Sequence, residues 1–215
     1  MTSGVKWNED YTDPNSDVAQ ASVWAGGPGM NPLVSYMRRL PREAEPGTKF
    51  VYKTGETDMA GILVANAVGK GLAQYMSEKL WRTYGMERDA IWMVDRGGME
   101  RGGCCISMTL RDYGRVGLFM LEGGKANGKQ ILPAWYAQES TSDQVKPPAD
   151  GDYGYFWWGR GDDGYSAQGI FGQQIRIVPK EKLIIVINSA YLKPTDKTLV
   201  AAMNAVLAGA REALH

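Results

Sequence analysis

Residues 165–188 have the sequence YSAQGIFGQQIRIVPKEKLIIVIN, and this stretch decides the fold class. It contains three short runs rich in apolar residues, at 166–171, 174–178 and 183–188, which are bounded by residues that favour turns. The segment 179–182 has the composition of a hairpin connection between the last two runs. We therefore expect an antiparallel meander of strands.

Helical patterns precede the meander, and one follows it. Helical apolar spacing, or residues typical of helix ends, occurs at 33–40, 57–68, 72–81, 109–121, 133–137 and 200–214. Helices, then an antiparallel sheet, then a closing helix are the order of an α+β fold. The 215 residues suit a single domain, in which 1–145 is mainly helix and loop and 146–215 carries the strands and the last helix.

The composition excludes several classes of function. The 24 basic and 24 acidic side chains cancel, so nothing indicates a surface for nucleic acid or for an anionic membrane. No apolar run reaches the length of a membrane-spanning helix, and the first residues lack the apolar core of a signal peptide. The sequence leaves the oligomeric state open, and also the choice between a cytoplasmic and a periplasmic location.

The histidine and cysteine content limits the chemistry further. The single histidine is His215, at a chain end that we expect to be frayed, so neither a Ser-His-Asp triad nor a histidine zinc site is expected. Cys104 and Cys105 are neighbours, and ordinary disulfide geometry does not suit neighbours. We expect them to be two small core residues. No metal and no organic cofactor is predicted.

Tyr52 is the first candidate for catalysis. It ends the apolar run 50–52, and a turn then leads into the helix predicted at 57–68. A phenol at such a cleft edge can move protons, provided that a nearby cation stabilises the phenolate. The alternative is a tyrosine that packs at the end of a strand.

Backbone groups near Ile170 are the second candidate. Gly169 and Gly172 flank the pair Ile170-Phe171 at a predicted strand edge, where free N–H groups can bind an oxyanion. The alternative is a bulged or strongly twisted strand. The strand-like aromatic run 153–158 could line a substrate pocket, or it could pack in the core.

Two short motifs are treated as coincidences. The residues 3–6, Ser-Gly-Val-Lys, have the spacing of a nucleophilic serine and its lysine, but Gly4 is a poor helix former. The residues 53–55 spell the Lys-Thr-Gly triad of penicillin-recognising enzymes, but they precede a helix, whereas that triad belongs on a strand.

Five motifs together resemble the serine hydrolases of the β-lactamase and penicillin-binding-protein superfamily. They are 2–5 (TSGV), 46–52 (PGTKFVY), 102–115 (GGCCISMTLRDYGR), 153–158 (YGYFWW) and 169–173 (GIFGQ), in the order that the superfamily has them. The chain is most similar to the branch of the 6-aminohexanoate-dimer hydrolases. The resemblance implies a β-lactamase/transpeptidase-like fold of which this chain is one incomplete domain.

The resemblance also implies roles for single residues. Tyr52 matches the catalytic tyrosine, and the backbone N–H of Ile170 matches the oxyanion donor. Tyr11 resembles the loop tyrosine that closes on substrate. Thr54, where an asparagine is usual, is expected to contact substrate.

Trp157 and Gly169, within the last two motifs, are also expected to contact substrate. Gln168 stands near the usual place of a lysine or histidine, which argues against efficient turnover of β-lactams.

The resemblance implies an enzyme that cleaves small amide or ester substrates through an acyl-enzyme, acting on 6-aminohexanoate oligomers or as an esterase. In the family a Ser-x-x-Lys helix precedes the first of the five motifs. Here that motif opens the sequence, so we expect that the nucleophile segment is missing and that the chain alone is inactive. A non-catalytic ligand-binding module and a penicillin-binding peptidase are the alternatives.

Overall fold

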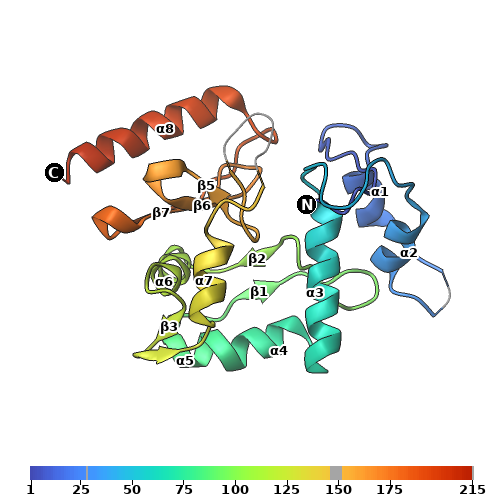
Figure 1. Ribbon diagram of the computed structural model, residues 1–215, viewed down its shortest axis with the longest axis horizontal. Coiled ribbons are helices and arrows are strands. Elements are labelled where there is room, and N and C mark those ends of the chain that lie inside the picture. The colour runs from blue at the N-terminus through green and yellow to red at the C-terminus, as the bar shows by residue number, and fades with distance from the viewer. Residues whose placement is uncertain (28, 146–151, 215) are drawn as a thin grey trace. The chain divides into compact units, whose positions relative to one another are not determined.

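The computed structural model describes residues 1–27, 29–145 and 152–214 (Figure 1). Within these ranges the chain forms two compact units, residues 1–108 and residues 109–145 with 152–214. The predicted boundary at 145–146 borders residues outside the described ones, and His215 also lies outside them. The division of one domain at residue 145 stays a prediction.

The first unit consists mainly of helices. Two short antiparallel strands of this unit pair with each other, with Ile91 opposite Ser107 and Trp92 opposite Ile106. The elements of this unit are α1 (Asp17–Val23), α2 (Pro32–Arg39), α3 (Thr54–Val68), α4 (Leu72–Met76), a π-helical turn (Ser77–Trp81), α5 (Arg82–Tyr84), β1 (Ile91–Trp92) and β2 (Ile106–Ser107).

The helices of the first unit begin where local chemistry satisfies their free N–H groups. Asn31 caps α2, because its side chain accepts hydrogen bonds from the N–H groups of Leu33 and Val34. Helix α3 begins at Thr54, earlier than the predicted residue 57. The carboxylate of Glu9 accepts the N–H of Thr54 at 3.0 Å. This partner is distant in sequence, so the local pattern could not indicate the start of α3.

A cluster of apolar side chains joins α1, α2 and α3. Trp7 packs edge to face on Tyr36, with 6.3 Å between the ring centroids. The buried members of the cluster are Trp7, Val18, Ala21, Leu33, Tyr36 and Ile62. The segment that contains Trp7 is therefore fixed against the helices.

The second unit contains a four-stranded antiparallel sheet in the order β5-β6-β7-β8, which confirms the predicted meander and the α+β class. Helix α6 begins after Thr109, whose side chain accepts the N–H of Asp112. The elements are α6 (Leu110–Leu121), β3 (Lys125–Ala126), β4 (Lys129–Gln130), α7 (Ala134–Ser140), β5 (Trp158–Gly159), β6 (Tyr165–Gln168), β7 (Gln174–Val178), β8 (Leu183–Ile187) and α8 (Lys197–Glu212).

Two of the predicted strands are shorter than expected. The run 166–171 leaves the sheet after Gln168, because the N–H of Gly172 bonds to the carbonyl of Gly169 and closes a turn. In the aromatic run 153–158, Tyr153 forms isolated bridges, 154–157 are bend or irregular, and only the last residue lies in β5. Phe156 has a φ of 67°, which strands do not accommodate.

The sheet of the second unit packs against α6 through one face. Paired strand residues share a face, and the α6 face includes Ile175 opposite Val186 and Ile177 opposite Ile184. Gly117 of α6 lies so close that an added Cβ would be 2.7 Å from Cγ2 of Ile184. The strand residues that alternate with these point to the opposite face of the sheet. On that face Val178 and Ile185 line a hollow together with Leu207 of α8. Figure 1 shows α6 and α8 flanking the strands. None of the helices in the described ranges is long and apolar enough to cross a bilayer.

We predict that Gly117→Ala destabilises the protein although alanine is the better helix former. The new methyl group must displace the packed side chain of Ile184, and overpacking costs about 1–3 kcal/mol, against a gain of about 1 kcal/mol in helix propensity. The matched control is Gly209→Ala in α8, where no atom lies within 4 Å of the added Cβ. Chemical denaturation should show a lower midpoint for the first variant and an equal or higher midpoint for the second. Equal stabilisation by both would contradict the close packing of α6 on the sheet.

Candidate active site

Three of the predicted site residues lie in the first unit, around the start of α3. Thr54 is the first residue of α3, and Tyr52 lies two positions before it. The hydroxyl of Tyr11, from the loop before α1, is 2.9 Å from Oγ1 of Thr54. Burial raises the pKa of Tyr11, and Glu9 and Tyr52 add to this electrostatically. The structure thus brings Tyr11 and Thr54 into contact and places Tyr52 within electrostatic range of them.

Glu9 links these residues, and the sequence analysis did not identify it. Its carboxylate accepts hydrogen bonds from the indole of Trp7, the phenol of Tyr11 at 2.8 Å, and both the N–H and the hydroxyl of Thr54. A signal was present in the sequence. Trp7, Glu9 and Tyr11 are alternate residues, and alternate residues of an extended segment share a face.

The surroundings of Tyr52 favour its neutral form. Burial raises the pKa of its phenol, and the negative charge of Glu9 raises this pKa further. Both effects oppose formation of a phenolate. A role as general base therefore requires a cation beside the ring, whereas a role as proton donor does not.

Glu56, a residue of α3, binds the chain segments that contain Lys53 and Ser3. It forms an ion pair with Lys53, whose side chain is wholly buried, at 3.1 Å, and it accepts a hydrogen bond from the hydroxyl of Ser3. Lys53 also donates to the carbonyl of Val51 at 3.3 Å. The two motifs treated as coincidences thus have structural contacts. Lys53 is the N-cap of α3, and 54–55 begin that helix, so the Lys-Thr-Gly motif is not on a strand.

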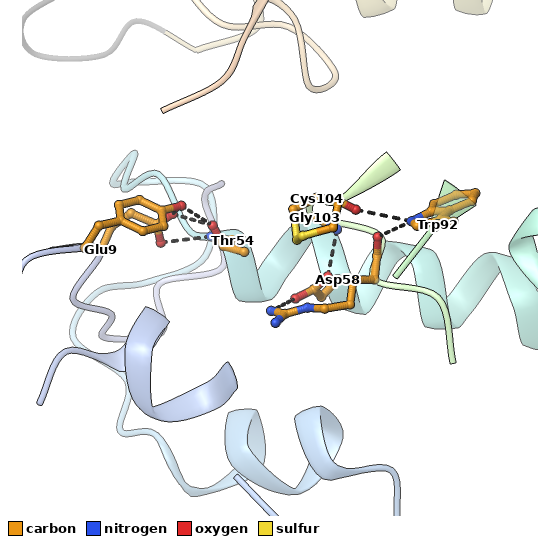
Figure 2. Close-up of a disulfide and its surroundings, with 9 residues drawn as sticks. Glu9, Thr54, Asp58, Trp92, Gly103 and Cys104 are labelled. Carbon is orange, nitrogen blue, oxygen red and sulfur yellow. Dashed lines mark hydrogen bonds and ion pairs between the residues drawn. A yellow bond between two sulfur atoms is a disulfide. The ribbon is translucent and has the colours of Figure 1, made fainter. Parts of the chain in front are cut away.

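The segment that follows β1 is fastened to the first turns of α3 by Asp58 (Figure 2). The buried carboxylate of Asp58 accepts the N–H of Gly103 at 2.7 Å and pairs with the guanidinium of Arg101 at 3.0 Å. A Cβ on Gly103 would lie 3.0 Å from Cγ2 of Thr54, so any larger residue at 103 would force Thr54 or the segment itself to shift. The glycine pair 102–103 therefore supports the start of α3.

Cys104 and Cys105 are joined by a disulfide, so the prediction of two unbonded core cysteines is wrong. Their side chains are half-buried rather than part of the core. The backbone of Cys105 has a φ of 78°, a left-handed conformation that local sequence rules do not anticipate for this residue type. The indole of Trp92 donates to the carbonyls of Arg101 and Cys104, which holds the chain on both sides of Gly103 (Figure 2).

The remaining predicted site residues lie in the second unit. Ile170 is in the turn between β6 and β7 and not on a strand edge, which corrects the predicted location. Within the described part of the chain its N–H has no hydrogen-bond acceptor, whereas its carbonyl accepts the N–H of Thr195 at 2.8 Å. The N–H of Gly169 is bonded to the carbonyl of Gln173. Trp157 packs edge to face on Tyr165, with 5.3 Å between the ring centroids.

Metal binding finds no support in the described ranges, which contain no group of three or more histidine, cysteine, aspartate or glutamate side chains arranged to hold an ion. The chemistry available at the start of α3 is that of hydroxyls, phenols and carboxylates.

The family model described as Beta-lactamase matches residues 1–210, and the chain belongs to this family. The chain is 28% identical over 213 residues to the 6-aminohexanoate-dimer hydrolase of Paenarthrobacter ureafaciens, covering 92% of this chain and 54% of that protein. It thus spans about half the length of this curated relative.

Solved structures agree with the family assignment. A Bacillus anthracis protein assigned as a 6-aminohexanoate-dimer hydrolase superposes with a TM-score of 0.80 at 25% identity, over 97% of this chain and 58% of that one. A penicillin-binding protein from Bacillus halodurans, 15% identical, has a TM-score of 0.67 over 96% of this chain and 70% of its own. The second likeness shows the fold alone. The fold is that of β-lactamases and transpeptidases, as the sequence predicted.

We predict that both cysteines resist alkylation in the denatured, non-reduced protein, because their sulfurs are bonded to each other. Treatment with a dithiol reductant before alkylation should add one label to each. Mass spectrometry of the peptide that contains 104–105 distinguishes the two cases. Full labelling without reductant would show that the cysteines are free thiols.

Proposed function

We propose that this chain is the part of a serine hydrolase that supplies a proton-transfer tyrosine and an oxyanion donor for the cleavage of small amide or ester substrates. The observation that carries the proposal is the position of Tyr52 two residues before α3, close to Tyr11 and Thr54, whose hydroxyl oxygens are 2.9 Å apart, in a chain of the Beta-lactamase family. The similarity to a 6-aminohexanoate-dimer hydrolase supports linear amides as the substrate class.

The reaction that we propose proceeds through an acyl-enzyme. We assign the nucleophilic serine and its lysine to a segment outside these 215 residues, and the coverage of 54% and 58% of two relatives supports this assignment. The serine attacks the carbonyl carbon, Tyr52 and the lysine move the proton to the leaving group, and water then releases the acyl group. The N–H of Ile170, which has no acceptor within the described residues, stabilises the oxyanion.

The raised pKa of Tyr52 is consistent with a mechanism in which Tyr52 and a nearby lysine transfer the proton together. Burial and Glu9 favour the neutral phenol, so Tyr52 needs an ammonium group nearby before it can act as a base. The adjacent Lys53 is already paired with Glu56. We therefore assign the cation to the lysine of the nucleophile segment. Tyr11, Thr54, Trp157 and Gly169 are the proposed substrate contacts.

We predict that Tyr52→Phe, in the full-length protein that contains this chain, lowers the turnover of an amide substrate by about a hundredfold or more, the scale of a general acid–base group. Phenylalanine keeps the ring and its packing and removes only the hydroxyl. Single-turnover acylation and deacylation rates measure the effect.

The control for this variant is its melting temperature, which should stay close to that of the wild type. Tyr75→Phe is a matched substitution in the same unit, on α4 and outside the proposed site, and it should leave both rates unchanged. Wild-type rates in a well-folded Tyr52→Phe protein would reduce Tyr52 to a packing residue.

We also predict that the 215-residue chain by itself neither hydrolyses nitrophenyl acetate above background nor reacts with a fluorophosphonate probe. Ser3 is the serine with the look-alike spacing, but its hydroxyl is bonded to Glu56, and the side chain of Lys6 is exposed. Stoichiometric labelling of Ser3, with activity lost in Ser3→Ala, would contradict the proposal that the nucleophile lies outside this chain.

A further inference from the structure

Glu9 occupies a central position in the first unit. One carboxylate receives four hydrogen bonds, from two aromatic side chains of its own segment and from the main chain and side chain of Thr54. Thr54 begins α3, and the N-cap Lys53 has no side-chain cap bond. Glu9, which lies in a different segment, therefore caps α3 in place of a local residue. The positive end of the helix dipole favours its negative charge at this position.

The number of protons around Glu9 fixes the orientation of two hydroxyls. Oη of Tyr11, Oγ1 of Thr54 and Oε1 of Glu9 are within hydrogen-bond distance of one another. When Glu9 is ionised, these three oxygens share only the two hydroxyl protons. Both protons go to the carboxylate, because a hydrogen bond to a charged acceptor is the stronger one. The hydroxyls of Tyr11 and Thr54 then keep their lone pairs free for other donors.

The charge of Glu9 also acts on Tyr52. Burial is the main cause of the raised pKa of Tyr52, and Glu9 is the charged group that contributes to it. The other charges beside this segment are paired, because Glu56 binds both the side chain of Lys53 and the N-terminal ammonium of Met1. A change in the charge of Glu9 therefore alters the pKa of Tyr52 and, at the same time, the hydrogen bonds of Tyr11 and Thr54.

We infer that Glu9 is a positioning residue of the active site, which holds Tyr11 and Thr54 in one fixed hydrogen-bonded arrangement beside Tyr52. The inference rests on the proposed function, because it assigns Glu9 to the same reaction. Glu9 acts through its neighbours and does not touch the reacting atoms.

The test compares Glu9→Gln, which keeps the size and removes the charge, with Glu9→Asp, which keeps the charge, in the full-length protein. We expect Glu9→Gln to lower kcat for an amide substrate by about tenfold to a hundredfold, the scale of a misplaced catalytic arrangement. Glu9→Asp should recover part of the loss. The limb of the pH–rate profile that Tyr52 sets should move to lower pH in Glu9→Gln, because the pKa of Tyr52 falls when the negative charge is removed.

A second measurement tests the hydrogen bond between Glu9 and Thr54 without an activity assay. The backbone amide of Thr54 donates to Glu9, so its NMR signal should shift in Glu9→Gln. Glu100→Gln is the matched control. Glu100 likewise accepts the N–H groups of Leu72 and Ala73 at the start of α4, and its loss should leave kcat and the pH profile unchanged.

The outcomes separate this inference from the proposed function. If Glu9→Gln shifts the Thr54 signal but retains wild-type kcat and pH profile, or if the Thr54 signal does not respond, the positioning role is overturned. If Tyr52→Phe retains wild-type turnover while Glu9→Gln loses it, the role of Tyr52 in the proposed mechanism fails and the positioning role of Glu9 stands.

Discussion

The structure of the first unit depends on the contacts at the first turns of α3. There three carboxylates bind three segments that are distant in sequence. Glu9 binds the N–H and hydroxyl of Thr54, Glu56 binds Ser3 and the buried Lys53, and Asp58 binds Arg101 and the N–H of Gly103. The N-terminus of a helix is a favourable place for negative charge, since free N–H groups and the helix dipole both stabilise it. Each buried acid or base in this region has a partner, as burial of charge requires.

This arrangement places the candidate chemistry on a rigid support. Tyr52 and Thr54 belong to the same short piece of chain, so the contacts that fix the start of α3 also fix both residues. Gly103 packs against Thr54 from the side of the disulfide, and Glu9 holds Thr54 from the side of Tyr11. The second unit is stabilised differently: one face of its sheet packs on α6 through apolar side chains, and Arg211 of α8 forms ion pairs with Glu181 and Asp163. Its candidate residue Ile170 offers a backbone group, for which the position in a turn matters more than the side chain.

The family assignment and the physical description of the site support each other at the level of reaction class. The Beta-lactamase family model covers residues 1–210, and one relative is named 6-aminohexanoate-dimer hydrolase. The described ranges offer phenols, hydroxyls and carboxylates, and no cluster suited to a metal. The chain spans about half the length of that relative.

The sequence by itself determined the features that depend on neighbours along the chain. The antiparallel meander follows from short apolar runs and turn residues, and the starts of α2 and α6 follow from the local caps Asn31 and Thr109. The motifs also determined the family. The tertiary structure alone decided the start of α3, the central place of Glu9 and the disulfide between Cys104 and Cys105, as well as the turn at Ile170. The start of α3 and the place of Glu9 depend on partners about forty residues apart, and the disulfide and the turn depend on backbone conformations that pattern rules do not specify.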